Sequence, residues 1–470
     1  LEAEGALDRG ARLQGSRPGS SDPGSYQEWL VIDERSDRVG FQQRHRRYDE
    51  AIEHWRFVYS GEDLMRISDP IERFAAEVRD PSFGEKRRSI ARLVPHLLVG
   101  EAFNAPASLR WLGLDELDGE RVDHVSWSVG GDAVTLMISH DTGALRAVEA
   151  MGDEPLLGDV PVRWIYDDYE PVEGLGPFPT GYSIELLGRT VKRVRFSKVE
   201  AGAASSHAVF SIPDGIRPPR TPPASKGKPE PRPARVIRRA PWVWQVAGIR
   251  AGFNVAFFEM EEYVVAFEAP SGWLELHQIP PGNFATGETS SSISESFIDL
   301  IHETVPGKPI RYVVLSHFHG DHAGGVRAFI EEGATIVTSE TAVELIRSAA
   351  ERRFRIGFDR QEVAGAEPEF LVVDDSTDLS DGERSLEILE ISPNPHVEGM
   401  LAIWLPEEKS LFVADLFHAQ PLERYPSAAE LPLQKAFVEW LDETGIEPER
   451  IYGVHGGVGT PAHLEKLRGR

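Results

Sequence analysis

His317, His319 and His322 occur within the six-residue segment HFHGDH, which also contains Asp321. In an extended chain, residues two apart point to the same side, so His317 and His319 can converge on one metal ion. Asp321 and His322 follow a glycine that lets the chain turn, and they can face a second ion beside the first. The chain has only 15 histidines in 470 residues, so the cluster is not a product of composition. The pattern HxHxDH therefore predicts a metal site.

Three further residues with metal-binding side chains stand downstream, each at the end of a predicted strand. They are His396 after SLEILEIS, Asp415 after SLFVA and His455 after IYGV. The chain contains no cysteine, so a metal ion can be bound only through histidine nitrogen and carboxylate oxygen. A centre of two zinc ions needs about seven protein ligands. The three downstream residues complete that number.

The elements that must position these residues alternate between strand and helix. The pattern predicts an opening hairpin over 252–270, an amphipathic helix over 291–305 and a buried strand over 311–316, directly before HFHGDH. Further strands are expected over 334–340, 385–393, 400–407 and 410–416, and further helices over 323–333 and 433–445. Alternation of this kind indicates an α/β layered architecture.

The order HxHxDH, then His, Asp and His, on such a chain resembles the metallo-β-lactamase-fold hydrolase superfamily over residues 241–470. The resemblance implies an αββα sandwich, two sheets packed between outer helices. It also implies two divalent metal ions, usually zinc, with iron or manganese in some members. By the same resemblance, the ligands are His317, His319 and His396 for the first ion, Asp321, His322 and His455 for the second, and Asp415 as the bridge.

Asp415 resembles the bridging carboxylate of glyoxalase II, lactonases and general hydrolases, which true β-lactamases lack. The implied activity is that of a dinuclear metal-dependent hydrolase acting on an ester, lactone, thioester or amide. Two divalent ions lower the pKa of a bridging water, so that hydroxide is available near neutral pH. Asp321 is the expected catalytic residue, because it can orient this hydroxide and carry its proton to the leaving group.

Two other functions stay open. A mononuclear iron oxygenase of the persulfide-oxidising type resembles the same fold but uses fewer ligands, so a complete second set of ligands favours the hydrolase. A non-catalytic binding protein is the other alternative. We expect substrate contacts from His418, Phe417 and Trp273, which lie in loops that can line the pocket.

The rest of the chain is predicted to form an accessory domain. Residues 27–214 contain alternating strands such as 121–129 and 133–139, joined to a helical pattern over 84–103, which predicts a mostly antiparallel α+β domain. The C-terminal segments look like those of exported bacterial hydrolases, several of which carry an N-terminal domain resembling a lipoprotein carrier. Polar residues 1–26 are predicted to be a flexible tail, and proline-rich residues 215–240 a linker.

Composition limits the partners. The hydrophobic fraction of 41% and charged fraction of 27% are those of a soluble globular protein, and no apolar run is long enough for a membrane span. The net charge of −26 argues against nucleic acid, so a small-molecule substrate is expected, with self-association left open. No leader peptide is evident at Leu1; a removed leader would favour a periplasmic or secreted protein, and otherwise a cytoplasmic one.

Overall fold

The structure is a computed structural model of the chain. It describes residues 1–9, 13–34, 37–47, 52–60, 63–68, 75–79, 90–129, 132–202, 208–210, 234–250, 253–272, 274–275, 282–283, 291–356, 366–423, 426 and 430–469.

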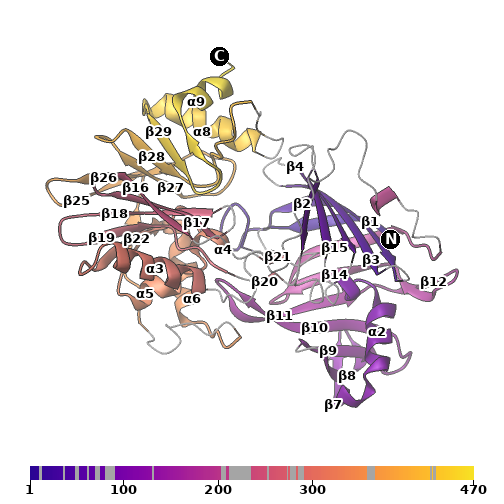
Figure 1. Cartoon of the computed structure of the whole chain (residues 1–470). Coiled ribbons are helices and arrows are strands. Elements are labelled where there is room, and N and C mark those ends of the chain that lie inside the picture. The colour runs from indigo at the N-terminus through magenta and orange to yellow at the C-terminus, as the bar shows by residue number, and fades with distance from the viewer. Residues whose placement is uncertain are drawn as a thin grey trace.

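The N-terminal part of the chain forms one antiparallel sheet of 13 strands, in the order β6-β5-β4-β3-β2-β1-β15-β14-β11-β10-β9-β8-β7. The first and last strands of this run, β1 and β15, are therefore neighbours inside the sheet (Figure 1). The strands are β1 (Glu2–Asp8), β2 (Pro23–Asp33), β3 (Arg38–Arg46), β4 (Ile52–Ser60), β5 (Asp63–Ser68), β6 (Ala75–Arg79), β7 (Arg110–Leu117), β8 (Glu120–Val129), β9 (Asp132–Ser139), β10 (Leu145–Glu154), β11 (Gly158–Tyr166), β14 (Gly181–Leu186) and β15 (Arg189–Lys198). Smaller elements beside the sheet are β12 (Tyr169–Val172), β13 (Gly176–Pro179) and the 3-10 turns η2 (Pro106–Ser108) and η4 (Ala208–Phe210).

One face of this sheet carries the core of the N-terminal part. Burial alternates residue by residue along β11, as the period of two in a half-buried strand requires. Trp164 and Tyr182 are fully buried, and Leu98 of helix α2 (Pro95–Asn104) joins the same cluster. The predicted antiparallel, β-rich N-terminal domain with some helix is confirmed.

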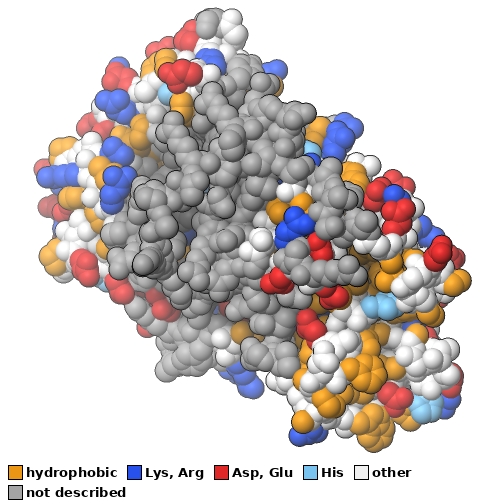
Figure 2. Space-filling view, turned by 45° about the vertical axis from the view of Figure 1, so that its right-hand side comes forward, with side chains coloured by type: hydrophobic (Ala, Val, Ile, Leu, Met, Phe, Trp, Pro, Cys, Tyr) orange, Lys and Arg blue, Asp and Glu red, His pale blue; other side chains and the backbone are white. Residues whose placement is uncertain are grey.

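The edge of the 13-stranded sheet at β7 exposes apolar side chains. Trp111, Leu112 and Leu114 on β7 and Phe103 near the end of α2 are all more than half exposed. Figure 2 shows hydrophobic side chains gathered at this lower end of the molecule, on the side turned away from the C-terminal sheets of Figure 1. This surface belongs to the N-terminal part alone.

The start of the chain is not the tail that its polar composition predicts for residues 1–26. β1 pairs with both β15 and β2, and Leu13 is buried among side chains of the C-terminal part. Strand pairing uses backbone N–H and C=O groups that every residue except proline carries in full. A polar sequence can therefore form a strand that a count of apolar residues does not detect.

The C-terminal part contains two sheets. The first has seven strands, in the order β16-β17-β18-β19-β22-β23-β24, and the second has six, in the order β25-β26-β27-β28-β29-β30. Their bounds are β16 (Arg235–Ala240), β17 (Val243–Arg250), β18 (Phe253–Glu259), β19 (Val264–Phe267), β22 (Ile310–Val314), β23 (Thr335–Ser339), β24 (Phe370–Val373), β25 (Ser376–Ser380), β26 (Ser385–Ile391), β27 (Met400–Leu405), β28 (Ser410–Val413), β29 (Arg450–Gly453) and β30 (Val458–Gly459). A separate short pair consists of β20 (Leu274–Glu275) and β21 (Gly282–Asn283).

Helices cover the outer faces of these two sheets. Figure 1 shows α3, α5 and α6 below the seven-stranded sheet, and α8 and α9 above the six-stranded one. Aromatic rings fill the space between the sheets, where Phe412 lies 5.0 Å from Phe258 and 6.4 Å from Phe267, measured between ring centroids. The predicted αββα sandwich is confirmed. The helices are α3 (Ser292–Thr304), α4 (Gly320–Ala323), α5 (Val326–Glu331), α6 (Glu340–Glu351), α8 (Leu431–Thr444) and α9 (Pro461–Leu467).

The end of the predicted linker belongs to the sandwich. Within 215–240, residues 215–233 lie outside the described residues, whereas Arg235–Ala240 form β16, paired with β17. The prediction of a linker rested on the prolines earlier in this range, since proline has no backbone N–H to donate. The segment RVIRRA contains no proline, so it can pair along its whole length. Among the helices described, none has the length and apolar character needed to cross a membrane.

Candidate metal centre

The residues predicted as metal ligands lie at the ends of strands, on one edge of the sandwich. His317 and His319 follow β22, and Asp415 follows β28. Buried parallel and antiparallel strands that end at a common edge bring their next residues together. All seven predicted residues meet there in two groups: His317, His319, His396 and Asp415, and Asp321, His322 and His455. Within each group the potential ligand atoms lie within 4.8 Å of one another.

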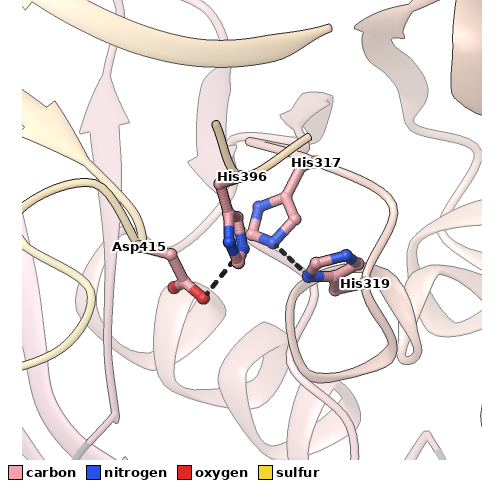
Figure 3. Close-up of side chains that lie close together, drawn as sticks. All are labelled: His317, His319, His396 and Asp415. Carbon is pink, nitrogen blue, oxygen red and sulfur yellow. Dashed lines mark hydrogen bonds and ion pairs between the residues drawn. The ribbon is translucent and has the colours of Figure 1, made fainter. Parts of the chain in front are cut away.

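The first group is formed by three buried histidines and one aspartate (Figure 3). His317 Nε2 lies 3.0 Å from His319 Nδ1, and His396 Nε2 lies 3.3 Å from Asp415 Oδ2. The three imidazole rings are at most 3% exposed. These rings therefore face one another away from solvent.

The second group adjoins the first through Asp415. Its Oδ1 lies 3.0 Å from His322 Nε2 and 3.2 Å from His455 Nε2. Asp321 Oδ2 lies 3.5 Å from the same His322 nitrogen. Asp321, Asp415 and His455 are each 18–25% exposed in their side chains, so the cluster is open on this side. Asp415 is the residue that faces both groups.

Charge within the cluster is distributed unevenly. Burial, together with neighbouring imidazoles, holds the pKa of His317 and of His319 well below the usual histidine value, so both rings are neutral. Burial also opposes charge on His322, but the carboxylates of Asp415, Asp321 and Glu268 outweigh it and raise the pKa of this ring well above the usual value. These three carboxylates thus favour a positive charge at the position of His322.

The donor set fits a pair of divalent ions. Each group offers one nitrogen or oxygen atom per residue, and these atoms all lie within 4.8 Å of one another. That is roughly the spread of ligand atoms that each lie about 2 Å from one ion. Neutral imidazoles and carboxylates are ligands of zinc, iron and manganese. A bound cation would also supply the positive charge that the carboxylates favour at His322.

Two residues that the sequence analysis did not single out hold the histidines from outside. Ser316 Oγ lies 2.9 Å from His317 Nδ1, and Glu268 Oε1 lies 3.2 Å from His322 Nδ1. Partners of this kind fix the orientation and tautomer of a ligand ring. Glu268 directly follows β19 and so obeys the same strand-end rule as the predicted ligands, but glutamate is too common in this chain to be singled out by that rule alone.

Arg250 plays a similar part beside Asp321. Its Nη2 lies 3.7 Å from Asp321 Oδ2, and its Nη1 donates a hydrogen bond to the carbonyl of Ser271 over 2.9 Å. The Ser271 hydroxyl in turn donates to the carbonyl of Gly320 over 2.6 Å. Arg250 ends β17, on the same edge of the sheet, and is therefore linked to the turn that carries Asp321.

The N-terminal part also reaches the histidines. The Gly15 carbonyl lies 2.9 Å from His319 Nε2, and Arg47 Nη2 lies 3.4 Å from His396 Nδ1. A Cβ atom at Gly324 would lie 2.4 Å from Cβ of Pro155, so the N-terminal part packs closely against the turn after HFHGDH. No local pattern in the sequence indicates these contacts, because they join residues hundreds of positions apart.

The three predicted substrate contacts have different positions. His418 lies beside the cluster, with its ring 5.2 Å from the ring of His455 and its Nδ1 3.2 Å from Glu430 Oε1. Phe417 is 1% exposed and packs 5.3 Å from Phe437, so the structure contradicts its role in the pocket. Adjacent residues on an extended chain point to opposite sides, and Phe417 is the one that points into the core. Trp273 lies outside the described residues.

Residues 289–457 match the family model described as the metallo-beta-lactamase superfamily, which confirms the predicted resemblance over these residues. A comparison with curated proteins found no match. Among solved structures, similar chains include a metallo-beta-lactamase from Pontibacter korlensis, with 19% identity, 51% of this chain and 100% of that chain covered, and a TM-score of 0.36. A metallo-beta-lactamase from Pseudomonas aeruginosa in its mono-zinc form has 18% identity, covers 51% and 95% and has a TM-score of 0.37. One from Hirschia baltica has 14% identity, covers 50% and 96% and has a TM-score of 0.35.

Proposed function

We propose that the chain is a metal-dependent hydrolase with a centre of two ions, which cleaves an ester, lactone, thioester or amide bond of a small molecule. The match of residues 289–457 to the metallo-beta-lactamase superfamily supports metal-dependent hydrolysis in general. The observation that carries the two-ion centre is the position of Asp415. One of its oxygens faces the first group of ligands and the other faces the second, at 3.0–3.3 Å.

In this proposal, His317, His319 and His396 would hold one ion and Asp321, His322 and His455 the other, with Asp415 as the residue that would serve both. When bound, two divalent ions supply a hydroxide near neutral pH and polarise the oxygen of the scissile bond. Zinc is the proposed metal, and iron and manganese also suit these ligands.

Asp321 is the proposed catalytic residue, with a role in proton transfer besides its role as a metal ligand. Its carboxylate can orient the attacking water and carry a proton to the leaving group. Its pKa is lowered, because His322 and Arg250 favour the charged form against the effect of burial and of Asp415. Asp321 is therefore in the carboxylate form, and its Oδ2 lies 3.7 Å from Arg250 Nη2 and 3.5 Å from His322 Nε2.

The partly exposed side of the cluster is where a substrate would enter. Asp321, Asp415 and His455 lie on that side, and His418 stands beside His455. We propose His418 as a substrate contact there. The N-terminal domain would shape access to the centre, as an accessory domain of the lipoprotein-carrier type.

A mononuclear iron oxygenase of the persulfide-oxidising type remains the second candidate, and a non-catalytic binding protein the third. The oxygenase needs fewer ligands than this cluster offers. The complete group of Asp321, His322 and His455 is the specific observation that favours the hydrolase.

The test combines metal content with turnover. The purified chain is loaded with zinc or manganese and assayed on lactone, aryl ester, thioester and β-lactam substrates, with a chelator control. We expect two ions per chain and chelator-sensitive hydrolysis of one class. One iron per chain without hydrolysis would instead support the oxygenase.

Two variants test the assigned residues. His319→Ala removes a proposed ligand of the first ion, and Asp321→Ala removes the proton carrier and a ligand of the second. Each is expected to lower kcat by at least about 100-fold, because general acid–base and electrostatic contributions are of that size. Circular dichroism checks the fold. Full activity in either folded variant, with its metal content measured, would overturn the mechanism.

A further inference from the structure

We infer that the backbone carbonyl of Gly15 is a built part of the metal centre and that residues 13–22, which we call the N-terminal strap, present it there. The Gly15 carbonyl fixes the ring of His319, and Asp22 holds the strap in the shape that presents this carbonyl. This inference rests on the proposed function and deepens it, because it makes the N-terminal part a positioning element of the first ion site.

The ring of His319 has one nitrogen for the centre and one for the strap. Its Nδ1 lies 3.0 Å from Nε2 of His317, inside the cluster, and its Nε2 lies 2.9 Å from the Gly15 carbonyl. A carbonyl oxygen only accepts, so Nε2 must carry the proton. A neutral imidazole has one proton, which leaves the lone pair of Nδ1 directed into the cluster. The strap thus selects the tautomer that can bind an ion through Nδ1.

Asp22 closes the strap on itself. Its carboxylate accepts a hydrogen bond from the backbone N–H of Ser16 over 2.8 Å, and the Ser16 hydroxyl lies 3.0 and 3.1 Å from its two oxygens. The Ser20 hydroxyl also donates to Asp22. Because Ser16 is the residue directly after Gly15, these bonds fix the peptide unit whose carbonyl faces His319.

The strap is attached to the C-terminal part on both sides of this peptide. On one side, Leu13 is buried in the core of the C-terminal part. On the other, the carbonyl of Ser16 accepts a hydrogen bond from the N–H of Glu398 over 2.8 Å. Glu398 lies two residues after His396, so the strap contacts the loops of two different ligands of the same proposed ion.

The alternative is that the strap only joins the two parts of the molecule. In that case it would make the same contacts with the C-terminal core, but the ring of His319 would not depend on it. The two roles predict different results for Asp22→Ala. A joining role changes stability alone. A positioning role also changes the affinity of one ion site and the tautomer of His319 in the metal-free protein, because these depend on the carbonyl and not on the strength of the joint.

The experiment uses the full chain and four variants of the strap. Asp22→Ala removes the carboxylate, Asp22→Asn keeps an acceptor oxygen, and Ser16→Ala keeps the backbone bond but loses the hydroxyl. The matched control is Ser21→Ala, in the same strap, whose hydroxyl bonds to Asp8 and not to Asp22. Zinc affinity is measured by competition with a chromogenic chelator, and the His319 tautomer by nitrogen NMR of metal-free protein, with His319→Gln used to assign the signal.

We expect the wild type and Ser21→Ala to bind two zinc ions alike and to show His319 protonated at Nε2. In Asp22→Ala, the affinity of one site should fall about tenfold, the low end of the range for loss of an outer partner. Asp22→Asn should recover part of this loss. A folded Asp22→Ala protein with unchanged affinity and unchanged tautomer would overturn the inference, and if Asp22→Ala does not fold, Ser16→Ala decides by the same readouts.

The failure of the proposed function would look different. A wild type that binds no zinc would refute the two-ion centre. The tautomer of His319 in the same metal-free samples would then still report whether the strap fixes the ring. A ring protonated at Nδ1 in the wild type would refute the strap inference directly.

Discussion

Glu268 is fully buried beside His322 and has a backbone φ of 77°. A residue other than glycine in this left-handed region costs about 1–3 kcal/mol, and a buried carboxylate needs a partner to offset its lost hydration. The ring of His322, 3.2 Å away, is that partner. Glu268 thus combines a strained backbone with a buried carboxylate, and that carboxylate contacts the ring of a proposed ligand. This combination indicates that the position of the carboxylate matters to the site.

The first prediction concerns the charge of Glu268. Glu268→Gln keeps the shape and one acceptor oxygen but removes the charge that makes the imidazole a stronger ligand. We expect the affinity for one of two zinc ions to fall by about tenfold. Chelator competition measures it. Glu259→Gln, on β18 and paired with Lys308 over 2.9 Å, is the control that should leave zinc affinity unchanged. Equal affinities in both variants would contradict the role given to Glu268.

Five of the seven proposed ligands could be predicted because histidine is rare in this chain, with 15 in 470 residues. The other two are aspartates that were predicted from their position: Asp321 lies inside HFHGDH, and Asp415 follows an apolar strand. Glu268 and Arg250 obey the same strand-end rule, but glutamate and arginine are common, so their types carried no signal. Gly15 could not be found, because a backbone carbonyl has no side chain to mark it. Phe417 was predicted wrongly, because sequence places a loop residue near a site but does not say which way its side chain points.

Within the 13-stranded sheet, strands β2 and β15 share a buried polar network although β1 lies between them. Lys192 Nζ donates to Glu28 Oε2 over 2.5 Å, and the hydroxyl of Tyr182 donates to Glu28 Oε1 over 2.7 Å. Burial lowers the pKa of Lys192, and Glu28 partly offsets this effect. The network thus places one charged pair in the buried interior of this part of the sheet.

The second prediction follows from removing one partner or both. Lys192→Met leaves the carboxylate of Glu28 buried without its cation, which should lower the free energy of unfolding by about 3–5 kcal/mol. The double variant Glu28→Leu with Lys192→Met removes both charges and should lie much closer to the wild type. Urea unfolding followed by tryptophan fluorescence compares them. If the double variant were as unstable as the single one, the packing of these side chains and not their charge would be responsible.

At the scale of elements, the sequence predicted the strands and helices around the site well. Apolar runs such as β28 and the last residues of β22 leave a clear pattern, because they are buried on both faces. β1 and β16 were assigned instead to a tail and a linker. Both are polar strands whose place in a sheet depends on a partner strand, β15 for β1 and β17 for β16. The composition of a segment taken by itself does not reveal such a partner.

The two parts of the molecule are joined by more than the strap. Leu156 of the N-terminal part belongs to the C-terminal core cluster. Asp159 accepts hydrogen bonds from the backbone N–H groups of Arg355 over 2.8 Å and Ile356 over 3.1 Å. The N-terminal part is therefore attached to the C-terminal part at further places besides the strap.

The third prediction is a dependence of whole-molecule stability on metal. A ligand that binds only the folded chain at 100 times its Kd adds about 2.7 kcal/mol to the free energy of unfolding. We expect zinc to raise the melting temperature of the wild type and a chelator to reverse the rise. His319→Ala should show a smaller response. Differential scanning calorimetry measures all three, and a melting temperature indifferent to zinc that is known to be bound would contradict the prediction.

The hydrogen bond between Gly15 and His319 joins residues 304 positions apart. Contacts this distant along a chain form late in folding, because a long loop must close before they are made. In the proposed centre, full affinity for the first ion would therefore depend on the completed fold, in which residues 13–22 lie against the loop that carries His319. A chain that misfolds or is cut between its two parts would keep the proposed ligands of both ions but would lose the contact that orients His319, and so would bind the first ion more weakly.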